Sequence, residues 1–241
     1  MKEENRNKPN TLYAIIGVAT LIVAIIGATF AYFSASATAK GDEISGQTEN
    51  NLSSALSLNV EKVIFDETGA NSDNLVPTDM TATVDGINTA IDQKCVANGY
   101  TGCHLYKITA KSTQDISNAS VRLTTLSTDA TDTASWKYAI YTNDGTSYNA
   151  TSIVDGGLGD FATFATTYTG EGKTGFDIHN NSSLTANNPV YYYLLIYLAN
   201  KDQVQNPEDT TNLNSGTGTY NGTISMDVLG GKVVASFSAS A

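Results

Sequence analysis

Two patterns of hydrophobic residues divide the chain. From Leu12 to Phe33 nearly every residue is apolar, and no charged side chain occurs between Pro9 and Ala39. A helix of this length would cross a hydrocarbon core of roughly 30 Å, so the stretch predicts an N-terminal hydrophobic helix that meets a membrane. Behind it, short apolar runs alternate with polar residues among many Thr, Ser, Asn, Asp and Gly. This second pattern predicts a mainly β exported part.

The alternation in the second part predicts several short strands. Leu56, Leu58 and Val60 alternate with polar residues, which is typical of a half-buried strand. Residues 190–198 are apolar at nearly every position and predict a central strand that is buried on both faces. Further strands are expected at 105–110, 121–126, 136–141, 223–228 and 232–237, and the last two would form a hairpin. Two segments stay ambiguous: 80–91 suits a strand pair or a short helix, and 156–170 suits a short helix or an aromatic-pinned loop.

Short strands separated by polar turns predict a mainly β fold, an antiparallel β-sandwich of jelly-roll or Ig-like type preceded by one N-terminal hydrophobic helix. The expected organisation has four parts. Residues 1–11 form a basic cytoplasmic n-region, 12–33 a signal peptide or transmembrane helix, 34–54 a flexible linker, and 55–241 an extracellular β-sandwich domain. About two hundred residues suit one such domain, or at most two small ones.

The flanks of the hydrophobic segment predict its orientation. Lys2, Arg6 and Lys8 precede it and favour a cytoplasmic N-terminus. An apolar stretch this long favours a retained anchor, whereas the small residues that follow it fit the A-x-A pattern of signal-peptide cleavage, with cuts after Ala37 or Ala39. Both alternatives remain open at this stage.

Cys95 and Cys103 are the only cysteines, and the turn-forming pair Asn98-Gly99 lies between them. In an oxidising compartment they would close a small disulfide loop, worth about 2–3 kcal/mol on the loop-entropy model. Two free thiols are the alternative. A metal site is disfavoured because the chain has only two histidines, His104 and His179, and no C-x-x-C.

The end of the hydrophobic segment, Gly27-Ala28-Thr29-Phe30-Ala31-Tyr32-Phe33-Ser34, resembles the export signals of TasA/camelysin-type fibre proteins of Gram-positive bacteria. The resemblance implies cleavage after Ala31 by a dedicated signal peptidase. The family often has an acidic residue soon after the Phe-Ser pair, whereas this chain has Ala35.

A second resemblance covers most of the body. The Cys95–Cys103 loop followed by Leu105–Thr109, then Tyr191–Leu198 and Thr219–Ser225, is similar to uncharacterised exported β-sandwich proteins of Firmicutes and related wall-less bacteria. The similarity implies export to the cell surface and no particular activity.

Charge restricts the partners. Beyond Ala39 the chain has 10 basic residues and 22 acidic ones. Such a surface repels phosphate backbones and anionic headgroups, so we expect no nucleic-acid partner.

The sequence contains no catalytic motif. Camelysin has been described as a metalloprotease, but neither His104 nor His179 belongs to an H-E-x-x-H motif. There is also no G-x-S-x-G elbow, and Asp66 and Asp73 miss the EF-hand spacing for calcium. We therefore expect no enzyme activity, no metal and no cofactor. Seven aromatic residues, in contrast, would suit either a sugar-binding platform or core packing: Trp136, Tyr138, Tyr141, Tyr191, Tyr192, Tyr193 and Tyr197.

These observations predict an exported cell-surface structural protein. In TasA-type fibres an N-terminal strand completes the sheet of a neighbouring subunit, and that resemblance implies a donor strand containing Leu56, Leu58 and Val60. The expected partners are other copies of the chain, the membrane through the N-terminal helix, and a signal peptidase. The alternative is a monomeric, membrane-tethered adhesin or ligand-binding module, and a secreted hydrolase is the third and weakest candidate.

Overall fold

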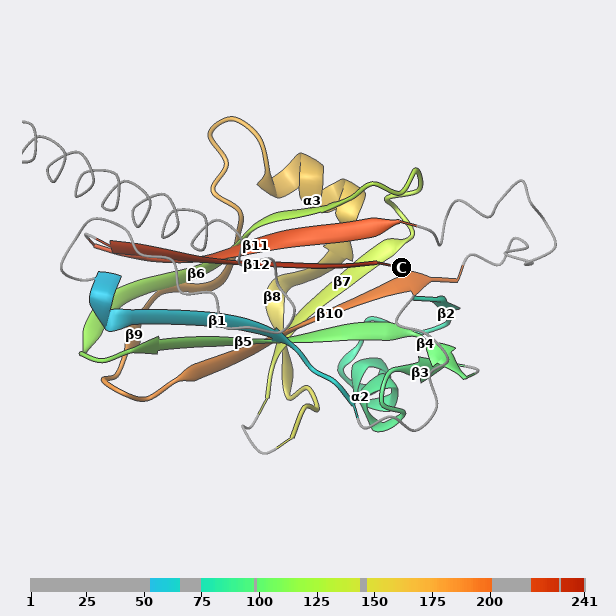
Figure 1. The fold of residues 1–241 in the computed structure, drawn as a ribbon, viewed down its shortest axis with the longest axis horizontal. Helices are drawn as coiled ribbons and strands as arrows, with labels where there is room; N and C mark the ends of the chain where they lie inside the picture. Colours follow the sequence, from blue (N-terminus) through green and yellow to red (C-terminus); the bar gives the residue numbers. More distant parts are fainter. Residues whose placement is uncertain are drawn as a thin grey trace, which may run out of the picture. The chain divides into compact units, whose positions relative to one another are not determined.

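The computed structural model describes residues 53–65, 75–97, 99–143, 147–200, 218–229 and 231–240. Within these ranges, two antiparallel sheets form a β-sandwich-like fold with few helices (Figure 1), which confirms the mainly β class. The predicted hydrophobic helix at 12–33 and nearly all of the predicted linker at 34–54 lie outside the described residues.

The first sheet has its strands in the spatial order β1, β5, β10, β7, β8. A 3-10 turn, η1 (Ser53–Ala55), leads into β1. A short strand, β2 (Pro77–Thr78), pairs in parallel with the end of β10. The bounds are β1 Leu56–Lys62, β5 Cys103–Ser112, β7 Trp136–Thr142, β8 Ser152–Asp160 and β10 Val190–Ala199.

The second sheet has the order β12, β11, β6, β9. Its strands β11 and β12 form the hairpin predicted near the C-terminus, with Val228 opposite Gly231. A separate small hairpin, β3 (Val96–Ala97) with β4 (Tyr100–Thr101), lies between the two cysteines. The bounds are β6 Ile116–Thr128, β9 Phe176–Leu184, β11 Thr219–Val228 and β12 Gly231–Ser240.

The main core fills the space between the two sheets. Alternate residues of each strand point into it because successive side chains of a strand face opposite sides of the sheet. The inner faces of β5 and β10 contribute Ile108, Leu194 and Ile196, all fully buried. They meet residues such as Leu123 and Ile224 from the second sheet.

A second apolar cluster lies on the outer face of the first sheet. There the alternate residues of β10, including Leu195, pack beneath helix α2 (Val84–Asp92). Thr83 caps α2 by accepting a hydrogen bond from the Gly86 N–H, and Ile87 and Ile91, one turn apart, face the sheet. Strand β10 is therefore buried on both faces, as its continuous apolar sequence predicts, and the ambiguous segment 80–91 is largely helical.

A second helix, α3 (Phe161–Tyr168), follows β8 directly. The Asp160 carboxylate caps it by accepting from the Thr163 N–H. Phe161 and Phe164 are buried in the main core, so the helical alternative for 156–170 holds in its second half. The first half is an edge strand instead, because Gly157 and Gly159 allow the backbone of β8 to approach Ile140 and Tyr138 of β7 closely.

Candidate functional site

The predicted donor residues lie together on β1. Leu56 and Leu58 are 9% and 3% exposed and belong to the main core, and Val60 packs against the same core while half-buried. On β5 these residues are opposite Ser112, Ala110 and Ile108. The sequence pattern therefore identified the buried face of the strand correctly, while the strand's role in assembly stays a prediction.

A continuous ladder of hydrogen bonds holds β1 against β5. All seven residues of β1 are in regular antiparallel register. The ladder continues past both ends, because the Thr113 N–H donates to the Ala55 carbonyl and the Val63 N–H donates to the Leu105 carbonyl, each at 2.8 Å. These hydrogen bonds join backbone groups, so a β1 strand from another copy of the chain could form them equally well.

The other side of β1 faces a seam between the two sheets. Among the described strands, β1 is paired with β5 alone and is the outermost strand of the first sheet. Strand β12 is the outermost strand of the second sheet and lies beside β1 without pairing to it (Figure 1). Removal of β1 would expose the core between β5 and β12.

The opposite edges of the sandwich are irregular. The pairing of β8 with β7 shifts register between Ala139 and Tyr141, and β8 contains three glycines. The pairing of β9 with β6 shifts register three times. Bulges and glycines of this kind keep edge strands from pairing with other chains. The regular β1 edge is therefore the better candidate for pairing between subunits.

A charged pair marks the C-terminal end of β1 on the outer face. Glu61 lies directly opposite Lys107 of β5, with 3.8 Å between the Lys107 Nζ and the Glu61 Oε1. The same ammonium lies 4.8 Å from the centre of the Tyr191 ring, on β10. Three strands are thus connected through one lysine side chain.

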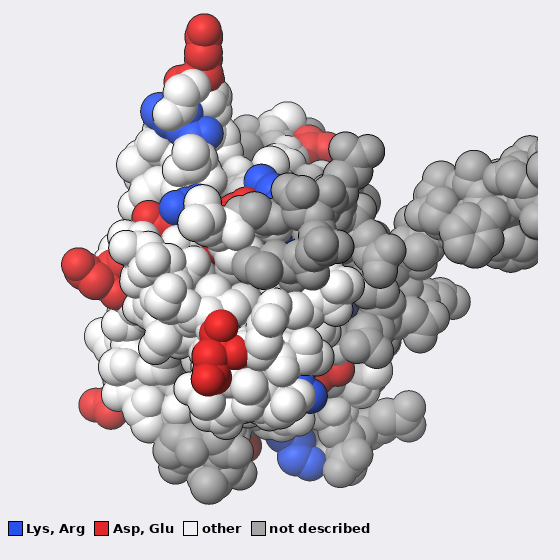
Figure 2. Space-filling model, turned by 90° about the vertical axis from the view of Figure 1, so that its left-hand side faces the viewer, with Lys and Arg blue, Asp and Glu red and all other residues white. Residues whose placement is uncertain are grey.

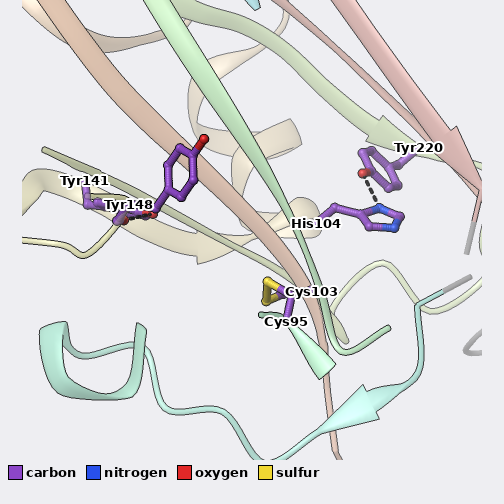
Figure 3. The surroundings of a disulfide bond; sticks show 6 residues. All are labelled: Cys95, Cys103, His104, Tyr141, Tyr148 and Tyr220. Atoms are coloured by element: carbon purple, nitrogen blue, oxygen red, sulfur yellow. Dashed lines mark hydrogen bonds between the residues drawn. A yellow bond between two sulfur atoms is a disulfide. The ribbon is translucent and has the colours of Figure 1, made fainter. Parts of the chain in front are cut away.

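The predicted disulfide joins Cys95 to Cys103, and both residues are 4% exposed (Figure 3). It closes the β3–β4 hairpin against the start of β5, where the Gly102 N–H also donates to the Cys95 carbonyl at 2.7 Å. Both cysteines belong to the outer cluster beneath α2. The disulfide therefore fastens the cover of this cluster to the sheet.

Each histidine contacts a tyrosine of the opposite sheet. His104 on β5 is 1% exposed, and its Nδ1 lies 2.6 Å from the Tyr220 hydroxyl on β11 (Figure 3), which in turn lies 2.7 Å from the Tyr106 hydroxyl. Burial raises the pKa of Tyr106 to about 12. On the other sheet, His179 on β9 hydrogen-bonds Tyr192 on β10 through its Nδ1. Within the described part of the chain, no group of three or more His, Cys, Asp or Glu side chains could hold a metal ion.

The aromatic residues that would suit a sugar platform are mainly core residues. Six of the seven are at most 6% exposed, and alternation along the strands sends them to both faces of the first sheet. Tyr148, which the sequence did not single out, is 40% exposed and packs edge-on against Phe65 and Tyr193. The packing alternative therefore describes this group better than a flat platform.

Several predicted residues cannot be placed. The cleavage candidates Ala31, Ala37 and Ala39, and the candidate calcium ligands Asp66 and Asp73, lie outside the described residues. None of the helices that the structure describes is long and apolar enough to cross a membrane. On the face drawn in Figure 2, charged side chains are scattered among a large majority of uncharged ones, with no continuous basic area.

No family model matches the chain, and no curated protein is significantly similar to it.

Proposed function

We propose that this protein is an exported, cell-surface structural protein whose subunits assemble by exchanging β1. The proposal combines the hydrophobic segment at 12–33, which predicts export, with the position of β1 in the fold. Of all the described strands, β1 comes first in the chain. It directly follows the predicted linker and the predicted cleavage sites.

The position of β1 at the seam carries the proposal. The strand contributes Leu56 and Leu58 to the core, and among the described strands it is paired with β5 alone. A β1 from a second copy would make the same ladder to β5 and fill the same apolar positions, so exchange between copies conserves the contacts. If the donor strand of each subunit enters the next subunit, the chain of subunits does not close, and a fibre results.

The strand order supports the Ig-like alternative for the sandwich. In an immunoglobulin constant-type domain the sheets have the orders A-B-E-D and C-F-G. Here β1, β5, β10 and β7 follow the first order, and β6, β11 and β12 follow the second. The strands β8 and β9 with α3 would then be an insertion between D and E. We infer an Ig-like sandwich in which β1 corresponds to strand A.

Electron microscopy of the exported protein tests the assembly. We expect filaments from the wild-type protein, and none after Leu58→Asp, because a carboxylate would have to enter the core between the sheets. Ser57→Asp is the matched control, because it places the same charge on the outer face of the same strand. Filaments should persist in this variant. A deletion of residues 32 to 60 should leave a less stable and strictly monomeric protein. Filaments that persist in the deletion variant would overturn the proposal.

A synthetic peptide with the sequence of residues 53–65 provides a second test. It should bind the deletion variant and raise its thermal stability, because it restores the missing strand. A peptide with Leu58→Asp should not bind. Absence of binding by the wild-type peptide would show that β1 cannot enter the seam from another molecule.

The rival function is a monomeric adhesin tethered to the membrane. The specific observation in its favour is that β1 occupies its own sheet, so a single chain is complete without a neighbour. N-terminal sequencing of protein recovered from cells separates the two. A mature N-terminus at Tyr32, Thr38 or Lys40 supports release and assembly, whereas an intact Met1 supports tethering.

A further inference from the structure

The hydrophobic pattern of β1 leaves its register against β5 incompletely specified. Because side chains alternate with a period of two, a slip of two residues keeps Leu56, Leu58 and Val60 on the buried face. Backbone hydrogen bonds form equally well after such a slip. Charged residues on the outer face can therefore help to discriminate the observed register from its neighbours.

The outer face contains such a feature in Glu61 and Lys107. In the observed register these two side chains are directly opposite, with 3.8 Å between Nζ and Oε1. A slip in one direction would place Glu61 opposite Leu105, which is 1% exposed and belongs to the outer cluster. A slip in the other direction would place it opposite the uncharged Thr109, diagonal to Lys107 and Lys111 and directly opposite neither. Both slips lose the direct opposition of the two charges, and the first also desolvates a carboxylate.

The lysine itself is held in place from the other side. Its Nζ lies 4.8 Å from the ring centre of Tyr191, and the backbone of Lys107 is opposite Tyr193 of β10. A cation placed over an aromatic ring is favourable. The ammonium is therefore positioned by β5 and β10 whether or not β1 is present.

We propose that Glu61 of one subunit and Lys107 of the next form a specificity pair that sets the register of the exchanged strand and the choice of donor. The inference rests on the proposed exchange of β1 and adds the residues that select the partner, a second copy of this chain. A donor strand with a positive residue at this position would be opposed by Lys107. Like charges that are directly opposite in an antiparallel pair are destabilising.

Charge-reversed subunits test the pair. Glu61→Lys and Lys107→Glu variants, each expressed as the full chain and collected as exported protein, are dissociated in denaturant and returned to buffer separately or mixed. Each variant alone has like charges at every interface, so its filament elongation, followed by light scattering, should be about three- to tenfold slower than wild type. An equal mixture should recover the wild-type rate, because every interface between unlike variants pairs opposite charges. The double variant should elongate normally alone and copolymerise poorly with wild type.

Two control variants test whether the slower elongation depends on where the charge is changed. Lys111→Glu makes the same charge change four residues along β5, opposite the uncharged Ser57, and Glu171→Lys makes the other change on an exposed loop. Both should elongate like wild type. Raising the salt concentration should reduce the difference between the variants because the pair is partly exposed.

The outcomes separate this inference from the proposed function. If wild-type protein forms no filaments, the proposed function fails and the specificity pair fails with it. If wild-type filaments form but both single variants elongate at the wild-type rate, alone and mixed, the exchange of β1 stands and the specificity pair is overturned.

Discussion

Both histidines of the chain connect the two sheets, each through a tyrosine. His104 reaches Tyr220 from the first sheet, and His179 reaches Tyr192 from the second. Buried polar side chains are costly unless they are hydrogen-bonded, so the contacts of the two Nδ1 atoms with tyrosine hydroxyls favour the observed arrangement of the sheets. The sequence showed that these histidines belong to no metal motif. Their cross-sheet contacts depend on residues far apart in the chain and were not predictable from local sequence.

His179 predicts a loss of stability at acidic pH. Burial lowers its pKa below the usual value, while a backbone hydrogen bond at Ser182 acts in the opposite direction with a smaller effect. The unfolded chain therefore binds a proton more readily than the folded one. The stabilising contribution is fully present above about pH 6.5, the usual pKa of histidine, and is lost as the pH falls through the lower pKa of the folded state.

Urea unfolding between pH 8 and pH 5 measures this effect. The midpoint for wild type should fall more steeply with acidification than that of His179→Gln, which keeps a polar side chain near Tyr192 but does not titrate. His104 is the same in both proteins. Parallel curves for the two proteins would contradict the prediction.

At the scale of single elements, the disulfide connects the β3–β4 hairpin to the sheet. The two cysteines are eight residues apart, and a loop of this size predicts a loss of about 2–3 kcal/mol when the bond is removed. We expect Cys95→Ala with Cys103→Ala to lower the free energy of unfolding by this amount, measured in urea. Because both residues are 4% exposed, the folded wild-type protein should also resist reduction. Rapid labelling of native protein by a thiol reagent after mild reductant would show that this loop opens freely.

Elements with strong local patterns were predicted well. The continuous apolar run of β10, the alternation in β1 and β5, and the C-terminal hairpin all appear where hydrophobic periodicity placed them. The pattern of apolar residues predicts these strands because each strand buries one or both of its faces, and the buried positions must be apolar. Some predicted bounds were short: the strand expected at 105–110 is β5, which spans Cys103–Ser112.

Strands with weak hydrophobic patterns were missed. The sequences of β8, with its three glycines, and of β9, with Asn180, Asn181 and two serines, carry no alternation that predicts a strand. Both are outermost strands that the remaining sheet holds in place through backbone pairing. The candidate site was likewise predictable only where its hydrophobic pattern is strong. The apolar side of β1 was evident. The opposition of Glu61 and Lys107 depends on the strand register, and 45 residues of the chain lie between these two positions.

At the scale of the whole molecule, the acidic body must reach the outside of the cell for either proposed function. Beyond Ala39 the acidic residues outnumber the basic ones by 22 to 10, and the basic residues before the hydrophobic segment favour a cytoplasmic N-terminus. We therefore expect proteinase K, added to intact cells that express the full chain, to remove an epitope placed at the C-terminus. A cytoplasmic marker protein should stay intact until the cells are lysed.

An epitope placed before Lys2 extends this experiment to the leader. In a tethered protein that epitope stays on the cytoplasmic side, so external protease should shorten its fragment to the hydrophobic segment and its flanks. In a processed protein the same epitope is already separated from the body before protease is added, and the C-terminal epitope appears in released material. Digestion of the body only after lysis would contradict export itself, and with it both the fibre and the adhesin, because each of them requires the β-sandwich body to meet its partner outside the membrane.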